Sequence, residues 1–220
     1  MPSQGAPASV RFAEGAPVLE TLFDGQLQVL STAYLQVDSQ TVASSFEYGT
    51  FTPFLPVSPG VHSLTARDTL GYAVGPLPTT ALTSGKRYTL IVVGSYPNYS
   101  VLTFEEPSGS GAQLSLYEAS PTVPQSAFGS FRASSHSDFK QLGSAHLGTV
   151  ATVSLGARVS DFGGYAGPAS APIGALTLKA IDPFDTRNVL PFHAAGRLSL
   201  FLFDPKAGTS IGPLFGSLDP

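Results

Sequence analysis

The sequence predicts an all-β protein, and three observations support that fold class. Gly and Pro, the poorest helix formers, occur 23 and 19 times among 220 residues. Apolar and polar residues alternate over short runs, which is the period of a strand. Turn signals such as Asp24-Gly25 and Pro59-Gly60 separate those runs. Together they indicate short antiparallel strands arranged as one sandwich in each half of the chain.

The alternation places the strands of the first half between turn signals. We expect them at residues 10–13, 19–23, 27–30, 33–38, 41–43, 50–57, 61–67, 86–93 and 101–105. Residues 86–93 are apolar on both faces, which predicts a central and well-covered strand. Residues 80–82 fit a helical turn, and nothing favours a longer helix.

The second half repeats the order of the first. Residues 118–121 correspond to 14–17, 148–149 to 49–50, 173–182 to 59–68, and 196–203 to 86–93. This indicates an internal duplication. We therefore expect a flexible N-terminal arm at 1–9, a first β-sandwich domain at 10–105, a linker at 106–112 and a second, diverged β-sandwich domain at 113–220. A Gly- and Ala-rich loop at 162–175 or the linker would carry any specialised surface.

Composition excludes several classes of function. The net charge is −4, and the 11 Lys and Arg residues form no basic stripe, which argues against nucleic acid as a partner. No apolar run approaches the roughly 20 residues of a transmembrane helix. Cysteine is absent, which removes disulfides and thiolate chemistry. The start shows no signal peptide, and Met1 is the only methionine, which fits a residue added to a processed, exported form; a cytoplasmic protein is the alternative.

Several blocks resemble a known bacterial family. They are residues 10–17, 34–38 with 42–44, 48–62 and 85–90, and they are similar to the family catalogued as domain of unknown function 4397. The resemblance implies tandem immunoglobulin-like antiparallel β-sandwich domains in exported or surface-attached proteins. The chain departs from the family where Glu14 replaces a histidine and where residues 27–31 are inserted. No catalytic or ligand residue is implied by the resemblance.

Histidine and serine residues offer one cluster that could suggest catalysis. His62, His136, His146 and His193 show no metal-ligand spacing. His136 and Asp138 lie among Ser134, Ser135 and Ser137, but a catalytic triad is defined by geometry rather than by adjacency in sequence. We interpret this segment as a polar surface loop.

The carboxylates and glycines are equally unspecific. Asp161, Asp182 and Asp185 could bind calcium, yet the dense acidic pattern of a calcium loop is missing, which favours turn-forming aspartates. We interpret Glu105 and Glu106 as solvated linker charges. Gly163, Gly164 and Gly167 lack the Lys and Ser/Thr of a phosphate loop, and Asn98-Tyr99-Ser100 is a bare glycosylation sequon. No catalytic, cofactor-binding or metal-binding residue is therefore predicted, and no cofactor.

Aromatic residues could bind sugars, although core packing is favoured for most of them. They form two groups: Phe46, Tyr48, Phe51 and Phe54, and Tyr88, Tyr96 and Tyr99. We expect a non-catalytic extracellular or cell-surface structural or adhesive protein. It could be a self-assembling filament or surface-layer subunit, whose arm 1–9 would add as a strand to a neighbouring copy. A carbohydrate-binding module of an exported protein is the alternative, and an unrecognised enzyme ranks third.

Overall fold

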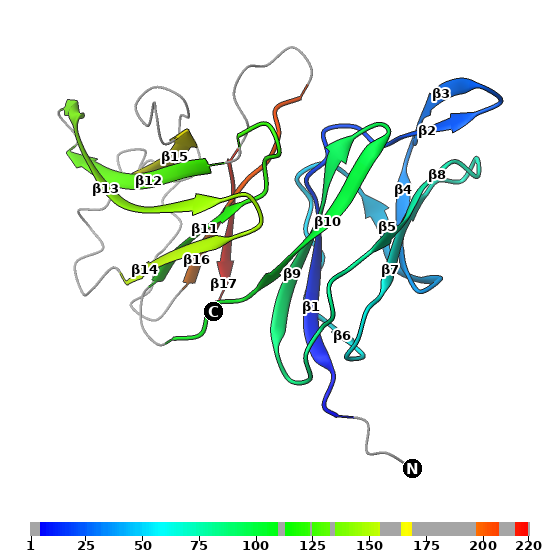
Figure 1. Cartoon of the computed structure of the whole chain (residues 1–220), viewed down its shortest axis with the longest axis horizontal. Helices are drawn as coiled ribbons and strands as arrows, with labels where there is room; N and C mark the ends of the chain where they lie inside the picture. Colours follow the sequence, from blue (N-terminus) through cyan, green and yellow to red (C-terminus); the bar gives the residue numbers. More distant parts are fainter. Residues whose placement is uncertain are drawn as a thin grey trace. The chain divides into compact units, whose positions relative to one another are not determined.

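The computed structural model describes residues 5–109, 113–123, 125–132, 135–154, 164–168, 197–206 and 214–219. Every regular element within these residues is a β-strand and most pairs are antiparallel, so the predicted all-β class is confirmed. The chain divides into two compact units, Met1–Glu106 (unit 1) and Pro107–Pro220 (unit 2). Figure 1 shows the strands of both units.

Unit 1 contains two four-stranded sheets and a separate hairpin. One sheet has the order β10-β9-β1-β6, the other β5-β4-β7-β8, and the hairpin is β2-β3. The strands are β1 (Ala8–Glu14), β2 (Glu20–Phe23), β3 (Gln26–Val29), β4 (Ala33–Val37), β5 (Gln40–Phe46), β6 (Leu55–Val57), β7 (Ser63–Arg67), β8 (Ala73–Pro78), β9 (Arg87–Ser95) and β10 (Asn98–Glu105).

The first strand, β1, lies in the middle of its sheet. It runs antiparallel to β6, and it runs parallel to β9, with Ser9 opposite Arg87. Ala8 and Ser9 are therefore strand residues, and Ala8 is fully buried. The prediction of a flexible arm reaching to residue 9 is wrong at these two positions, because β1 already includes them.

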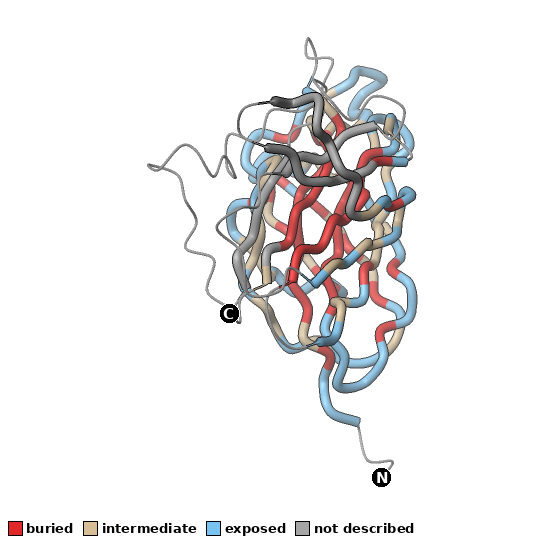
Figure 2. The backbone as a smooth tube through the Cα atoms, turned by 90° about the vertical axis from the view of Figure 1, so that its left-hand side faces the viewer, coloured by how far each residue is buried: buried red, intermediate tan, exposed pale blue. Residues whose placement is uncertain are grey.

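The core of unit 1 lies between its two sheets. Val10, Phe12 and Leu90 come from one sheet, Leu35 and Leu64 from the other, and all five side chains belong to a single buried cluster. Such burial stabilises the fold by roughly 25 cal/mol for each Å² of apolar surface removed from water. Figure 2 shows buried residues along the middles of the strands and exposed residues at the turns.

Three sequence expectations for unit 1 change in detail. Residues 50–57 form only the short β6 and a bridge between Phe51 and Ala13. Residues 80–82 form no helical turn; instead Leu82 bridges to Gly60. The predicted central strand is confirmed, because β9 lies between β1 and β10 and its residues 88–93 are buried.

In the described residues of unit 2 there is a four-stranded sheet of order β14-β11-β16-β17 and a three-stranded sheet of order β13-β12-β15. β11 runs parallel to β16, as β1 does to β9, and the rings of Tyr117 and Phe201 stack across this pair at 4.4 Å. The strands are β11 (Gln113–Glu118), β12 (Gln125–Arg132), β13 (Ser135–His146), β14 (Val150–Ser154), β15 (Gly164–Pro168), β16 (Arg197–Leu202) and β17 (Leu214–Asp219).

Candidate interaction surface

The hairpin β2–β3 exposes large apolar side chains. Its two-residue turn is Asp24-Gly25, both at positive φ, as a tight hairpin turn requires. Leu22 pairs with Leu27, and Glu20 pairs with Val29, so the three apolar side chains among them share one face. Leu22, Phe23, Leu27 and Val29 are between 48% and 56% exposed. The apolar side chains whose alternation predicted a strand here are therefore exposed to solvent and do not belong to the core.

Asp68 joins the end of the hairpin to the β7–β8 turn. Its side chain is buried and accepts hydrogen bonds from the backbone N and Oγ of Ser31, at 3.2 and 3.4 Å. It also accepts from the backbone N atoms of Leu70 and Tyr72, both at 2.9 Å. The ring of Tyr72 in turn contacts the ring of Phe23, with centroids 5.4 Å apart. One carboxylate thus holds two neighbouring loops in place.

Tyr99 of β10 fixes the start of the hairpin. Its hydroxyl donates to the carbonyl of Val18 at 3.0 Å and accepts from the backbone N of Glu20 at 2.9 Å. Burial raises the pKa of Tyr99, so the phenol stays protonated and keeps its donor at neutral pH. The hairpin is therefore attached to both sheets of unit 1, through Tyr99 and through Asp68.

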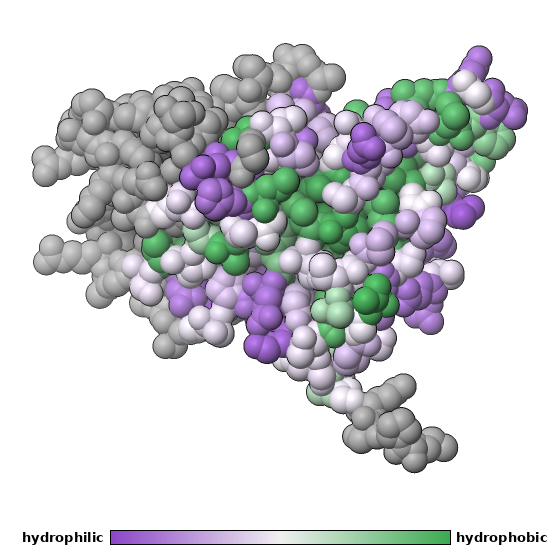
Figure 3. Space-filling view, viewed as in Figure 1, coloured by the Kyte–Doolittle hydropathy of each residue, from purple (hydrophilic) through white to green (hydrophobic). Residues whose placement is uncertain are grey.

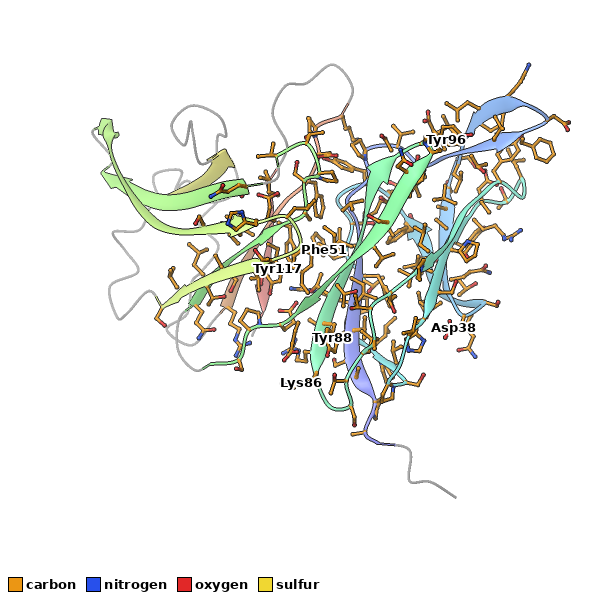
Figure 4. The ribbon with its side chains drawn as sticks, in the orientation of Figure 1. Asp38, Phe51, Lys86, Tyr88, Tyr96 and Tyr117 are labelled. Carbon is orange, nitrogen blue, oxygen red and sulfur yellow. The ribbon has the colours of Figure 1, made fainter. Side chains whose placement is uncertain are left out.

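These residues define one surface, called here the apolar end: Val18, Leu22, Phe23, Leu27, Val29, Leu70, Tyr72 and Tyr96. Figure 3 shows apolar residues covering much of the hairpin, and Figure 4 places Tyr96 at the same end of unit 1. Among the described residues, the other exposed large apolar side chains are Val61 and Leu147. A group of exposed large apolar side chains at one end of a unit indicates an interaction site.

Asp68→Ala is expected to loosen this surface. The variant removes a buried acceptor of four hydrogen bonds, so the free energy of unfolding of unit 1 should fall by about 2 kcal/mol. Amide exchange at Ser31, Leu70 and Tyr72 should quicken before exchange in β9. Unchanged exchange at these amides would contradict the role given to Asp68.

Both units contain a buried glutamate at the same position. Glu14 ends β1 and Glu118 ends β11, and each accepts a hydrogen bond from the backbone N two residues later, that of Ala16 at 2.7 Å and that of Ser120 at 3.0 Å. Their own carbonyls accept from the N atoms of Gly49 and Gly148. The correspondence that the sequence predicted between residues 14–17 and 118–121 is confirmed by these bonds.

Burial raises the pKa of both glutamates. For Glu118 the pKa reaches about 7, because desolvation outweighs the hydrogen bonds from Ser126 and Ser120. For Glu14 the pKa lies well above its usual value, and Oε2 has no hydrogen-bond partner among the described residues. In each unit, burial therefore favours the neutral, protonated form of this glutamate side chain.

A second carboxylate lies near Glu118. Asp204 follows β16 and accepts hydrogen bonds from Oγ of Ser120 at 2.6 Å and from N and Oγ1 of Thr122 at 3.0 and 2.8 Å. The hydroxyl groups of Ser120 and Thr122 are therefore hydrogen-bonded to the Asp204 carboxylate. Within the described ranges no three His, Asp or Glu side chains form a group that could hold a metal ion.

Glu106 was predicted to be a solvated linker charge, and that interpretation is wrong. Its carboxylate lies 3.2 Å from Nη2 of Arg11 and also accepts from Oγ1 of Thr89, and both charged side chains are almost fully buried. Its backbone N donates to the carbonyl of Arg87, which extends the β9–β10 pairing by one residue. Glu105, by contrast, is half exposed and pairs with Lys86 at 2.8 Å, which raises the pKa of Lys86.

Two of the histidines, His62 and His146, make hydrogen bonds that hold turns of the chain. His62 places Nδ1 2.6 Å from Oδ2 of Asp38 and Nε2 2.7 Å from the carbonyl of Ser58, and the contact with Asp38 lowers the pKa of that carboxyl. The backbone of His146 pairs with Thr149 in the turn before β14. His62 thereby links the β4–β5 turn to the β6–β7 turn.

Other predicted candidates fall elsewhere. Asp161, Gly163, Asp182, Asp185, His193 and most of the loop 162–175 lie outside the described residues, as does Ser134. Ser135, His136, Ser137 and Asp138 belong to strand β13, not to a loop, because this segment pairs with β12. Gly164 and Gly167 lie in strand β15, and Asn98 begins β10.

The aromatic residues divide between core and surface. Phe46 and Tyr88 are buried in the core of unit 1, as core packing predicted. The Phe54 ring centroid lies 4.9 Å from Cζ of Arg11 and 4.1 Å from Cζ of Arg87. Phe23 and Tyr72, which sequence reasoning did not single out, belong to the apolar end. The sequence signal that could have pointed to the apolar end was the insertion at residues 27–31, because it includes most of β3.

The chain was compared with known protein families, and part of it matches one of them. Residues 28–127 match the family described as Domain of unknown function (DUF4397). The predicted family resemblance is confirmed. The DUF4397 match starts inside β3 and ends inside β12, so β2 and the hairpin turn lie outside it. No curated protein matches the chain. In the described part of the chain, no helix has the length and hydropathy needed to span a bilayer.

Proposed function

We propose that this chain is a non-catalytic structural or adhesive module of the outside of a bacterial cell, and that it attaches through the apolar end. The supporting observation is the exposure of Leu22, Phe23, Leu27 and Val29 on a hairpin that Asp68 and Tyr99 hold in place. A preorganised surface loses little conformational entropy on binding, which favours attachment.

The path of the chain through unit 1 suits this role. β1 and β9 run parallel, and the N of Glu106 bonds to the carbonyl of Arg87, so the chain enters and leaves unit 1 at the same end. Figure 1 shows the start of β1 at the opposite end of unit 1 from the β2–β3 hairpin. Within unit 1, the apolar end therefore lies at the opposite end from residues 8 and 106.

Two finer statements belong to the same proposal. The paired sheets of unit 1 support an immunoglobulin-like sandwich, and the repeated parallel pair β11–β16 supports a related fold in unit 2. The low share of charged residues and the DUF4397 resemblance support export to the cell surface. Immunoglobulin-like sandwiches present binding loops at their ends, which agrees with the position of the hairpin.

The variant Leu22→Ser/Val29→Ser tests the proposed attachment. Purified protein is mixed with cell envelopes of the source organism, and the bound fraction is measured after sedimentation. Each substitution removes about 1 kcal/mol of apolar burial at a half-exposed site, so affinity should fall at least about tenfold. Val61→Ser is the matched control, because Val61 is more exposed than either residue but lies outside the apolar end. Equal binding of wild type and the double variant would refute the proposal.

Carbohydrate binding is the second candidate, because the apolar end includes the rings of Phe23, Tyr72 and Tyr96. Aromatic faces stack on sugars through their apolar C–H surfaces, and Phe23 and Tyr72 already lie side by side. Binding on a glycan array that Tyr96→Ala and Phe23→Ala abolish would favour this function. Binding to envelopes stripped of glycans would favour a protein partner.

A further inference from the structure

The outer edge of β3 is open to a further strand. Among the described strands, β3 pairs with β2 alone. The N of Leu30 donates to the carbonyl of Leu19, which fixes the alternation of hydrogen bonds along the hairpin. The main-chain groups of Gln28 therefore point toward β2, whereas those of Leu27 and Val29 point outward. The edge thus presents donors and acceptors beside two exposed apolar side chains.

This edge lacks the features that usually prevent strand addition. Proteins protect their edges with charges, prolines or bulges. Residues 26–29 are Gln-Leu-Gln-Val, and the register with β2 is regular. The edge strand β8, by comparison, contains Pro76 and Pro78. β3 is therefore an edge that another strand can extend.

We infer that β3 pairs with β3 of a second copy of this chain, antiparallel and about a two-fold axis at Gln28. The inference rests on the proposed function and names the partner of the apolar end. In this register Leu27 lies opposite Val29 of the second copy, and both such pairs exchange main-chain hydrogen bonds. Leu22, Leu27 and Val29 of the two copies then form one continuous apolar face.

The absence of charge on β3 supports a second copy as the occupant, and the small area of the strand limits how tightly it binds. The paired segment is uncharged, so identical strands meet without repulsion, and Asp24 lies beyond its end. Two four-residue strands bury less than the roughly 1,200 Å² of a stable complex, so the pair is weak and forms at high local concentration. Such conditions hold for modules crowded on one surface. An isologous pair also closes on itself, giving dimers rather than filaments.

Single cysteines test the register, because the chain has none of its own. Gln28→Cys places two cysteines directly opposite, with Cα atoms about 4.5–5.5 Å apart, within the range of a disulfide. Gln26→Cys is the matched control, since its two thiol-bearing positions would lie about 13 Å apart, four residues along the strand. Under mild oxidation Gln28→Cys should yield at least about tenfold more covalent dimer than Gln26→Cys.

The control also excludes chance collisions. Gln26 is more exposed than Gln28, so random oxidation would favour Gln26→Cys. In sedimentation equilibrium, wild type should show a concentration-dependent dimer, and Gln28→Lys should stay monomeric because two like charges face each other. Equal dimer yields from the two cysteine variants, or a wild type that is monomeric throughout, would overturn the inference. Loss of envelope binding by Leu22→Ser/Val29→Ser alongside either result would leave the proposed function standing with a different partner.

Discussion

Glu106→Gln is expected to lower the free energy of unfolding of unit 1 by about 3 kcal/mol. The carboxylate lies 3.2 Å from Nη2 of Arg11, and the two side chains are only 5% and 3% exposed. Nε of Arg11 also donates to Oγ1 of Thr89 at 2.7 Å, so the three side chains form one buried network. Removing the negative charge leaves a buried guanidinium with less compensation for its lost hydration. Urea denaturation followed by circular dichroism measures the change.

Glu105→Gln is the matched control for this prediction. Glu105 is the preceding residue, but it is half exposed and pairs with the exposed Lys86. Surface pairs contribute little to stability, so this variant should unfold close to wild type. The double variant Arg11→Met/Glu106→Leu should regain most of the loss, since an apolar pair removes both buried charges. Similar midpoints for Glu106→Gln and Glu105→Gln would show that Glu106 is solvated after all.

Glu118→Gln is expected to make unit 2 more stable at pH 8 and to change little at pH 4. The pKa of Glu118 is raised from its usual 4.5 to about 7 in the folded unit. Stability from the neutral carboxyl is complete below pH 4.5, because both states are protonated there. It is lost as the pH rises from 4.5 to about 7, where the unfolded chain releases its proton before the folded one. Glutamine has nearly the same size and shape as the neutral carboxyl group and does not ionise, so the variant avoids this loss of stability.

The expected gain at pH 8 is at most about 3 kcal/mol, the equivalent of the shift in pKa. Calorimetric melting of wild type and Glu118→Gln between pH 4 and pH 8 measures it. Glu14→Gln should act in the same direction in unit 1, whereas Glu47→Gln, at an exposed residue of the turn that contacts Glu14, should not. A Glu118→Gln variant that melts below wild type at pH 8 would contradict the assignment of a neutral carboxyl.

Strand positions were predictable wherever alternation and turn residues agreed. The Asp24-Gly25 hairpin and the buried β9 are such cases. β8 was missed because Pro76 and Pro78 indicate a strand break, yet β8 pairs with β7 alone, and an edge strand tolerates a residue without an N–H. Glu106 was misinterpreted because its partner Arg11 lies 95 positions away in the sequence. The residues around Glu106 do not predict so distant a contact.

The apolar end was beyond sequence reasoning for a different reason. Leu22, Leu27 and Val29 alternate as core residues do, and only the three-dimensional arrangement shows that their face meets solvent. We expected any specialised surface in the second half or at the linker, whereas the apolar end lies in the first half. The insertion at residues 27–31 indicated where the chain differs from the family, but it did not indicate that the apolar side chains there are exposed.

The parallel pairing of β1 with β9 has a consequence for how the protein folds. Arg11 and Thr89 are hydrogen-bonded although they lie 78 positions apart in the sequence, and β11 depends in the same way on β16. The first strand of each unit therefore cannot complete its sheet until nearly the whole unit has left the ribosome. Such distant pairing slows folding to milliseconds or longer. This late folding would suit the export proposed above, because an export channel takes an unfolded chain.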